Sequence, residues 1–475
     1  MSDLREEFQK LVDSGSPVGE VIAVQKFFVK VKGLHPISAQ SIVLFEDGTR
    51  GYVRATNSEY VSIFTMSTVP VLVGTVVVKY SDQLTTSVGE ELIGRVISPL
   101  GEPLDGKGPL RKLTQRPIFA VAPAIHEREA LNELLETGVS TIDSLFPIVK
   151  GQRLALIGDM KGGKTTLAAQ VGIHQKDTDT IVVYALIARR QGDIDELVTL
   201  LEKNGSLNSS IVIATTIFDS LVTSYLAPYV ACAVAEYFWQ DKDRDAVIVY
   251  DDLTSHAQIY REMSLVSGTN PGRDSYPGDI FYIHSSLLER AGKLQRNHRT
   301  LTALPIVLAS GGDVTAFLPT NIISITDGQW ILDAEIFKEG LRPAISTSLS
   351  VTRVGGRGHT SRQKDVAGRT LRAFSAYRQA LEYSHFGAEL SATSMNDLRI
   401  GTLLTSALNQ LPGESYSLLA QQLLLELLLD SNEHTHLPEM GELKKKAESY
   451  AAKITAKSPY EDVLVSFKQL YGLKG

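Results

Sequence analysis

A phosphate-binding loop is the clearest chemical signal in the chain. The run GDMKGGKTT, from Gly158 to Thr166, has the spacing G-x-x-x-x-G-K-T. Glycines at these positions let backbone N–H groups turn onto phosphate oxygens, and the positive end of the following helix adds to the attraction. Lys164 would reach the β and γ phosphates of a nucleotide, and the Thr165 hydroxyl would ligate magnesium. The loop therefore predicts a nucleotide site.

A pair of carboxylates is the second signal. The run AVIVYDD ends a near-continuous apolar stretch with Asp251 and Asp252. A carboxylate at the tip of a buried strand is costly unless a cation or hydrogen bonds face it. In a P-loop protein Asp251 is therefore expected beside the magnesium ion, as a partner of its water ligands. Asp252 is expected to cap a helix.

Hydrolysis would need one more group, which orients the attacking water and is usually a carboxylate near the γ-phosphate. In hexameric RecA-like ATPases it is a Glu in a G-E-R motif, at the end of the strand after the P-loop helix. Here TIVVYALI is followed by ARRQGD, and Arg189 stands at that position. Because the pKa of arginine stays above about 12, Arg189 cannot act as a base. Asp193 and Asp195 lie further on, in a predicted first helical turn where acids are ordinary. The sequence thus predicts binding without turnover.

Three kinds of sequence surround these residues. The first is β-rich, because VGEVIAVQKFFVKVKGL alternates apolar and charged residues and Asp47-Gly48 is a hairpin signal. The second alternates apolar strands with helical stretches, which indicates an α/β core with parallel strands. From about His359 the pattern is helical. The predicted fold is a multidomain α/β chain with an N-terminal β-barrel or sandwich over 1–84, a P-loop domain over 85–359 and a helical bundle over 360–475.

Composition limits the partners of the chain. Its 475 residues are 43% hydrophobic and carry a formal net charge of -7, which argues against nucleic acid and against a polybasic membrane anchor. The single cysteine, Cys232, excludes an intrachain disulfide and a thiolate metal cluster. The N-terminal run MSDLREEFQKLVDSG lacks the apolar segment of a signal peptide. The apolar segment from Leu418 to Asp430 is shorter than the ~20 residues of a membrane-spanning helix. We expect membrane contact only through another subunit.

Several long blocks, in the right order, resemble the alpha subunit of F-type rotary ATP synthases. They are VGEELIGRVISPLGEPLDGKGPL, GVSTIDSLFPIVKGQRLALIGD, AVIVYDDLTSHAQIYREMSL, PGRDSYPGDIFYIHSSLLERAGKL, PTNIISITDGQ and LRPAISTSLSVTRVGG. The resemblance covers nearly the whole chain. The catalytic beta subunit, secretion export ATPases and Rho-like helicases share the P-loop. The YDDL and LSVTRVG motifs and the missing G-E-R favour alpha over them.

The resemblance implies a subunit that alternates with beta subunits in an alpha3beta3 ring around a gamma shaft, with a peripheral stalk or delta contact. It implies an ion-translocating synthase (H+ or Na+) at the cytoplasmic face of a bacterial membrane, or an organelle-encoded equivalent, in which the alpha site binds Mg-ATP or ADP without hydrolysis. In that family Arg353, in LSVTRVGGRGHT, matches an arginine finger that serves the neighbouring beta site, with Arg357 as its rival. The matching site residues are Gly158, Asp159, Met160, Lys161, Gly162, Gly163, Lys164, Thr165 and Thr166 at the phosphates, Thr165 and Asp251 at magnesium, and Phe337, Arg342 and Gln410 around adenine.

The chain also departs from that family. The run from Met160 to Gly162 replaces R-Q-T, Arg189 replaces a Gln, and Ser310 replaces a Gln near the γ-phosphate. These changes indicate a divergent alpha subunit or a paralogue in a specialised rotary ATPase. The added positive charge of Lys161 and Arg189 favours retained nucleotide binding. Two alternatives stay open, namely a homohexameric export-type ATPase and a structural ring subunit that holds no nucleotide.

Overall fold

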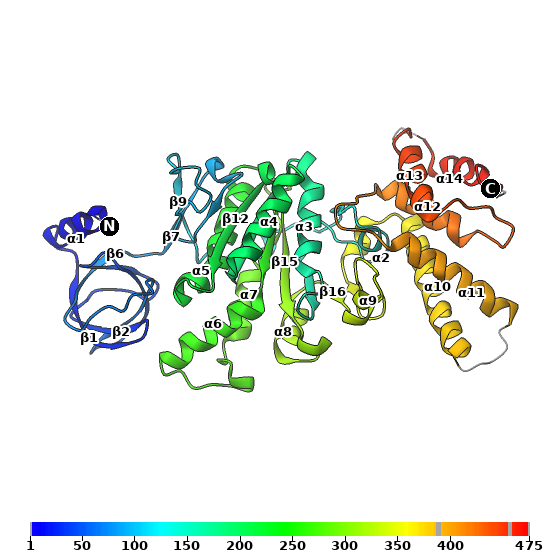
Figure 1. Ribbon diagram of the computed structural model, residues 1–475. Coiled ribbons are helices and arrows are strands. Elements are labelled where there is room, and N and C mark those ends of the chain that lie inside the picture. The colour runs from blue at the N-terminus through cyan, green and yellow to red at the C-terminus, as the bar shows by residue number, and fades with distance from the viewer. Residues whose placement is uncertain (1, 386–390, 455–457, 474–475) are drawn as a thin grey trace.

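The chain folds into three parts that follow one another in a row (Figure 1). The computed structural model describes residues 2–385, 391–454 and 458–473. A strand-rich part lies at the N-terminal end, a helix-covered sheet lies in the middle, and helices alone form the C-terminal end. The multidomain α/β fold class predicted from the sequence is confirmed. The domain boundaries at residues 84 and 359 stay a prediction.

The N-terminal part is a closed barrel with strand order β1-β2-β5-β4-β3-β6. Its alternating pattern points one set of side chains inward, so Val29 and Val31 are fully buried. Helix α1 covers the outside, where Phe8 packs against Leu44 and Val78. The elements are α1 Ser2–Asp13, β1 Val18–Gln25, β2 Phe28–Lys32, β3 Ile42–Phe45, β4 Arg50–Thr56, β5 Val61–Thr65 and β6 Val76–Ser81.

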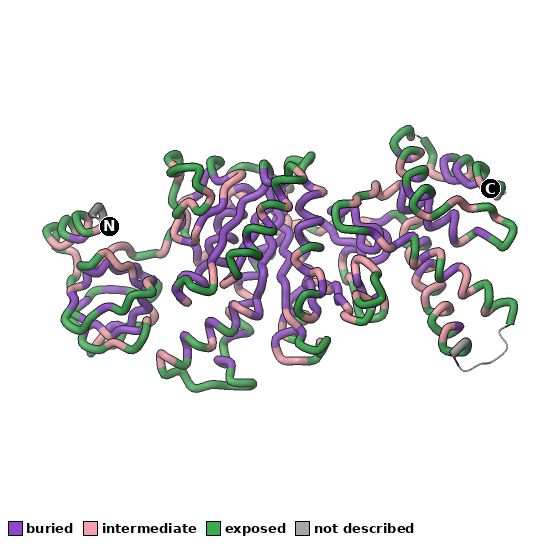
Figure 2. Tube along the Cα trace, in the orientation of Figure 1, coloured by how far each residue is buried: buried purple, intermediate pink, exposed green. Residues whose placement is uncertain are grey.

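The central sheet has the order β17-β16-β10-β15-β13-β11-β12-β8. The strands from β16 to β8 pair in parallel, and β17 pairs antiparallel at the edge. Buried residues concentrate in these strands (Figure 2), as expected of strands that are covered on both faces. Strand β14 also pairs with β15, antiparallel, whereas β7 and β9 form a separate two-stranded sheet. The strands of the middle part are β7 Thr85–Val88, β8 Val96–Ile97, β9 Thr114–Pro117, β10 Ala155–Gly158, β11 Ile181–Arg189, β12 Ser210–Thr216, β13 Ala246–Asp251, β14 Gly292–Lys293, β15 Thr300–Leu308, β16 Gly328–Leu332 and β17 Val351–Thr352.

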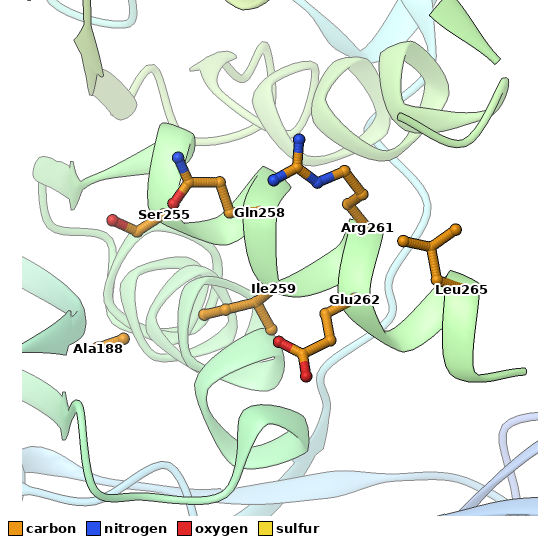
Figure 3. A pocket seen from close by; sticks show the side chains of 7 residues that line it. All are labelled: Ala188, Ser255, Gln258, Ile259, Arg261, Glu262 and Leu265. Carbon is orange, nitrogen blue, oxygen red and sulfur yellow. The ribbon is translucent and has the colours of Figure 1, made fainter. Parts of the chain in front are cut away.

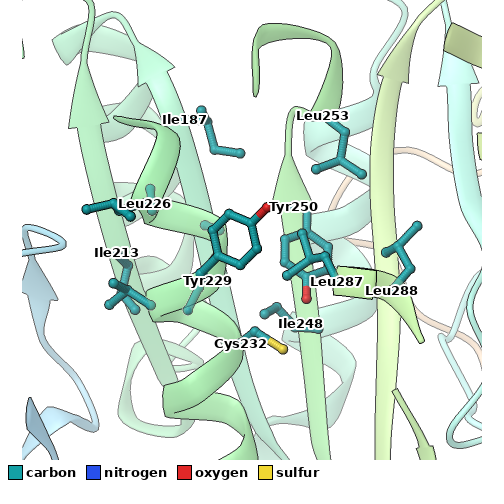
Figure 4. Close-up of a cluster of buried hydrophobic side chains, with 14 of the residues drawn as sticks. Ile187, Ile213, Leu226, Tyr229, Cys232, Ile248, Tyr250, Leu253, Leu287 and Leu288 are labelled. Carbon is teal, nitrogen blue, oxygen red and sulfur yellow. The ribbon is translucent and has the colours of Figure 1, made fainter. Parts of the chain in front are cut away.

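The helices of this part include one whose length and apolarity would let it cross a membrane. It runs from Leu221 to Asp241, and 89% of its apolar window is buried inside the protein. Its Cys232 lies among side chains of the neighbouring strands (Figure 4), and burial raises the pKa of this thiol to about 11. The segment is therefore a core helix with an unreactive thiol. The helices are α2 Ser140–Leu145, α3 Lys164–His174, α4 Gln191–Lys203, α5 Leu221–Glu236, α6 Leu253–Val266, α7 Ile280–Leu288, α8 Phe317–Ile325 and α9 Ala334–Lys338.

The C-terminal part consists of helices that pack around the apolar helix α12. Helix α12 is formed by the apolar segment that begins at Leu418, and its Leu423, Leu427 and Leu428 are fully buried. Its Glu426 is also fully buried and pairs with Arg362 of α10. The prediction of a helical bundle is confirmed. The helices are α10 Ser361–His385, α11 Ala392–Leu408, α12 Leu418–Leu429, α13 Met440–Ala451 and α14 Tyr460–Gln469.

Candidate nucleotide-binding site

The glycine-rich loop connects strand β10 to helix α3, as the sequence predicted. A Cβ at Gly158 would lie 2.6 Å from the Leu332 carbonyl oxygen, so only glycine fits there. Gly163 has a φ of 87° and directly precedes the helix, which is the left-handed conformation that glycine adopts readily. Lys161 also has a positive φ, 58°. These features produce the tight turn that a phosphate cradle needs.

The loop residues differ in how they are exposed and bonded. Met160, Lys161 and Thr166 are exposed, whereas Gly162 is buried. The Asp159 carboxylate accepts hydrogen bonds from the Met160 N–H at 2.7 Å and, across the sheet edge, from the Gly311 N–H at 3.2 Å. The second bond places the Ser310–Gly312 turn beside the loop, where the resemblance expects Ser310.

Lys164 is buried within the loop. Only 6% of the Lys164 surface is exposed, and the Lys164 Nζ donates a hydrogen bond to the Asp159 carbonyl oxygen at 2.5 Å. The pKa of Lys164 is lowered to about 8, chiefly by burial and also by nearby Arg189, while Asp252 and Asp159 oppose the shift. A buried ammonium with a single carbonyl partner gains a strong electrostatic partner when a phosphate enters.

The expected magnesium residues lie together. The Thr165 Oγ1 of α3 donates to the Asp251 Oδ2 of β13 at 2.7 Å, and Asp251 is 1% exposed. A hydroxyl and a carboxylate are the oxygen ligands that magnesium prefers, so the residues present fit this metal. Within the described ranges no three His, Cys, Asp or Glu side chains form a metal cluster. A magnesium ion here would therefore complete its shell with water and phosphate oxygens.

Sequence reasoning missed one contact of Asp251. Arg189 pairs with the Asp251 Oδ1, and its guanidinium lies 3.5 Å from the Asp252 Oδ2. Strand β11, which ends at Arg189, and strand β13, which ends at Asp251, are parallel neighbours in which Leu186 lies opposite Asp251. A bulge between Leu186 and Arg189 and a positive φ of 50° at Ala188 bend the strand end. The sequence did offer a signal for this contact, because Arg189 and Asp251 end two parallel strands, and the ends of such strands lie at the same edge of the sheet.

Asp252 behaves as predicted. It directly precedes helix α6, and its side chain accepts a hydrogen bond from the Ser255 N–H at 2.6 Å. This is the geometry of an N-cap. Asp252 therefore has a structural role at the start of α6 in addition to its proximity to Arg189.

The residues expected around adenine lie on the other side of the loop. The Arg342 guanidinium carbon is 3.4 Å from the centre of the Phe337 ring, and a Cβ at Gly163 would be 3.8 Å from that ring. The Gln410 N–H donates to the Arg342 carbonyl at 2.6 Å. However, the Gln410 amide bonds to the backbone of Gly138, Glu414 and Ser140. The structure brings these three residues together, and an adenine contact of the Gln410 side chain stays a prediction.

Arg353 lies far from its own chain's loop. It follows β17, whose Thr352 pairs with Gly328 at the start of β16, whereas Gly158 pairs with Leu332 at the end of β16. At ~3.3 Å a residue these two levels are about 13 Å apart along the strand. Arg353 is exposed, and its guanidinium donates to the Thr326 carbonyl at 3.1 Å.

A pocket of about 540 Å³ opens beside Ala188 and along helix α6 (Figure 3). It is at the β11 and β13 side of the sheet edge, next to the charged strand ends. It is not the expected adenine side, because neither Phe337 nor Arg342 lines it. Its lining residues are Ala188, Ser255, Gln258, Ile259, Arg261, Glu262 and Leu265.

Comparison with known proteins agrees with this geometry. Residues 138–352 match the family described as "ATP synthase alpha/beta family, nucleotide-binding domain". The ATP synthase subunit alpha of Aquifex aeolicus (strain VF5) is 40% identical over 398 residues, which are 83% of this chain and 79% of the relative. That of Clostridium botulinum (strain Eklund 17B / Type B) is 41% identical over 404 residues, 84% and 79% of the two chains. That of Sulfurovum sp. (strain NBC37-1) is 40% identical over 410 residues, 86% and 81%. The chain therefore belongs to the family of ATP synthase alpha subunits.

Proposed function

We propose that this chain binds an adenine nucleotide, ATP or ADP, in the loop from Gly158 to Thr166 and does not hydrolyse it. The observation that carries the proposal is the combination of an intact loop with a basic residue where a water-orienting carboxylate is required. Lys164 is buried in the loop and Thr165 is bonded to Asp251, which supports phosphate binding. Phe337 and Arg342 flank the loop and would hold the base.

The absence of turnover follows from the group at the end of β11. Arg189 is paired with Asp251 and cannot accept a proton from water at neutral pH. The carboxylates of Asp193 and Asp195 are exposed on helix α4, and the latter accepts a hydrogen bond from Gln191 at 2.9 Å. We therefore assign neither carboxylate the task of orienting a water at the loop. Hydrolysis at this site therefore lacks its general base.

Thr165 and Asp251 are the residues that would hold a magnesium ion. Such an ion supplies positive charge that offsets the charge of the phosphates. In this arrangement Lys164 binds phosphate oxygens, Thr165 orients its hydroxyl toward the metal, and Asp251 fixes that hydroxyl.

We also propose that Arg353 serves a neighbouring subunit. It is exposed just after the edge strand β17, and it lies about 13 Å along the sheet from the level of its own loop, which supports contact with a phosphate across a subunit boundary. The glycines after it permit a close-fitting turn, because a Cβ at Gly355 would lie 1.6 Å from the Pro147 carbonyl oxygen. An arginine finger stabilises the charge of the transferring phosphoryl group and is worth ~10³ to 10⁵ in rate. Arg357, also exposed in this turn, is the rival.

The proposed assembly is an alternating alpha3beta3 ring with a gamma shaft and a peripheral stalk or delta subunit. In it the catalytic sites belong to beta, and ATP synthesis or hydrolysis is coupled to H+ or Na+ transport. The chain would lie peripherally at the cytoplasmic face of a bacterial membrane, with contact to the bilayer only through the ion-translocating part. Its family membership supports this proposal.

Two measurements on the purified chain test the proposed function. Equilibrium dialysis with Mg-ATP is expected to show saturable binding, and an ATPase assay without beta subunit is expected to show almost no hydrolysis. A purified chain that forms a homohexamer and hydrolyses ATP would favour the export-type ATPase. A chain that binds no ATP would favour the purely structural ring subunit.

A further inference from the structure

The two carboxylates at the end of β13 already have a cation beside them. Asp251 and Asp252 are 1% and 0% exposed in their side chains, and Arg189 contacts the first and lies 3.5 Å from the second. Burying two adjacent carboxylates without a positive partner would be strongly unfavourable. The Arg189 guanidinium, 24% exposed, provides that partner within the chain itself.

The pair is held in place by the surrounding backbone. The bulge before Arg189 and the left-handed conformation of Ala188 bend the end of β11. On the opposite side of the carboxylate, Thr165 donates to the Asp251 Oδ2. Both oxygens of Asp251 are therefore engaged, one by a cation and the other by the hydroxyl of the phosphate-binding helix.

A divalent cation has two electrostatic roles at such a site. It offsets the charge of the phosphates, and it separates them from the acidic strand end, which would otherwise repel them. Here the second role is already met, because Arg189 neutralises the acidic end. Lys164 and the backbone N–H groups of the loop would act on the phosphates of a bound nucleotide directly.

We propose that Arg189 stands in for the divalent cation, so that this pocket binds ATP with little dependence on magnesium. The inference rests on the proposed nucleotide binding and specifies its metal requirement. It also gives the arginine a role beyond the loss of hydrolysis, since an uncharged residue at position 189 would leave the carboxylates dependent on the metal.

The test is a titration of the purified full-length chain with ATP by calorimetry, at constant ionic strength, with excess magnesium or with excess EDTA. For the unchanged chain, we expect the dissociation constants in the two buffers to differ by less than about threefold, which is below 1 kcal/mol. For Arg189→Gln, we expect ATP affinity in EDTA to fall at least about tenfold below that in magnesium. Arg190→Gln is the matched control, because it removes the same charge from an adjacent exposed position and should behave as the unchanged chain.

The outcomes separate this inference from the proposed function. If the unchanged chain loses tenfold or more of its ATP affinity in EDTA, the inference is overturned while nucleotide binding stands. If Arg189→Gln stays independent of magnesium, Arg189 is not the substitute cation. If no ATP binds in either buffer, both proposals are overturned. The titration of the unchanged chain needs no variant, so it decides the first point even if Arg189→Gln does not fold.

Discussion

Replacing Lys164 by methionine should change stability and nucleotide binding in opposite directions. Methionine keeps an unbranched side chain of similar length and removes the ammonium group. The lysine is buried, and its pKa is lowered from 10.5 to about 8 chiefly by that burial. This displacement corresponds to about 3 kcal/mol at ~1.4 kcal/mol per pKa unit. At pH 7, below both values, Lys164 is protonated in the folded and unfolded chain, so the full cost of burying its charge is present.

The expected gain in stability is smaller than that cost. The Lys164 Nζ donates to the Asp159 carbonyl, and the loss of this bond costs about 1 kcal/mol. We therefore expect Lys164→Met to raise the free energy of unfolding of the nucleotide-free chain by about 1–2 kcal/mol. The same change removes a charged hydrogen bond to phosphate, so affinity for ATP should fall by about 10- to 100-fold.

Thermal unfolding without nucleotide and calorimetric ATP titration measure the two effects. Lys176→Met, at an exposed position just after helix α3, is the control and should change neither. If Lys164 had only a structural role, its replacement would destabilise the protein and leave ATP binding unchanged. If Lys164→Met lowers the unfolding temperature and leaves ATP affinity unchanged, the assignment of Lys164 to the phosphate site is refuted.

Three further predictions concern other parts of the site and its partner. In the reconstituted ring, Arg353→Lys should preserve assembly and nucleotide binding but lower multisite ATP hydrolysis by ~10³-fold or more, because lysine lacks the planar fork of the guanidinium group. Near-normal hydrolysis by this ring, together with an inactive Arg357→Lys ring, would show that Arg357 and not Arg353 is the arginine finger. Arg189→Glu should show no appreciable hydrolysis by the purified chain, because it restores only one of the necessary groups, while the altered environment at Ser310 and the contribution of the neighbouring subunit remain unsuited to hydrolysis. Robust phosphate release by this variant would show that these other groups are not what keeps the site inactive. Ala188→Gly should stabilise the chain by about 1 kcal/mol in denaturant unfolding, because glycine adopts a positive φ without a Cβ clash. Ala185→Gly, in the buried middle of β11, should destabilise it, and equal effects at both positions would rule out strain at Ala188.

Local sequence patterns predicted the elements of the fold well. Alternation around Val29 and Val31 predicted barrel strands, since successive side chains of a strand point to opposite faces. The continuous apolar runs of β11 and β13 predicted parallel strands covered on both sides. The glycine spacing predicted the loop that leads into helix α3, because the left-handed conformation at Gly163 is one that a residue without a Cβ adopts readily. These features depend on neighbouring residues, so the sequence alone determines them.

Only the tertiary structure decided which distant residues meet. Sequence spacing placed Arg189 near the phosphates, but the order of the sheet and the bulge in β11 directed its guanidinium to Asp251. Gln410 was expected at adenine, and only the structure showed that its amide bonds to backbone groups of Gly138, Ser140 and Glu414; an adenine contact of this side chain stays a prediction. Arg353 was assigned to a neighbouring beta site from the family resemblance, and the pairing of β17 adds that the preceding residue, Thr352, lies at the opposite end of β16 from the partner of Gly158; its role as a finger stays a prediction. Strand order, register and domain packing depend on long-range contacts, which no local pattern encodes.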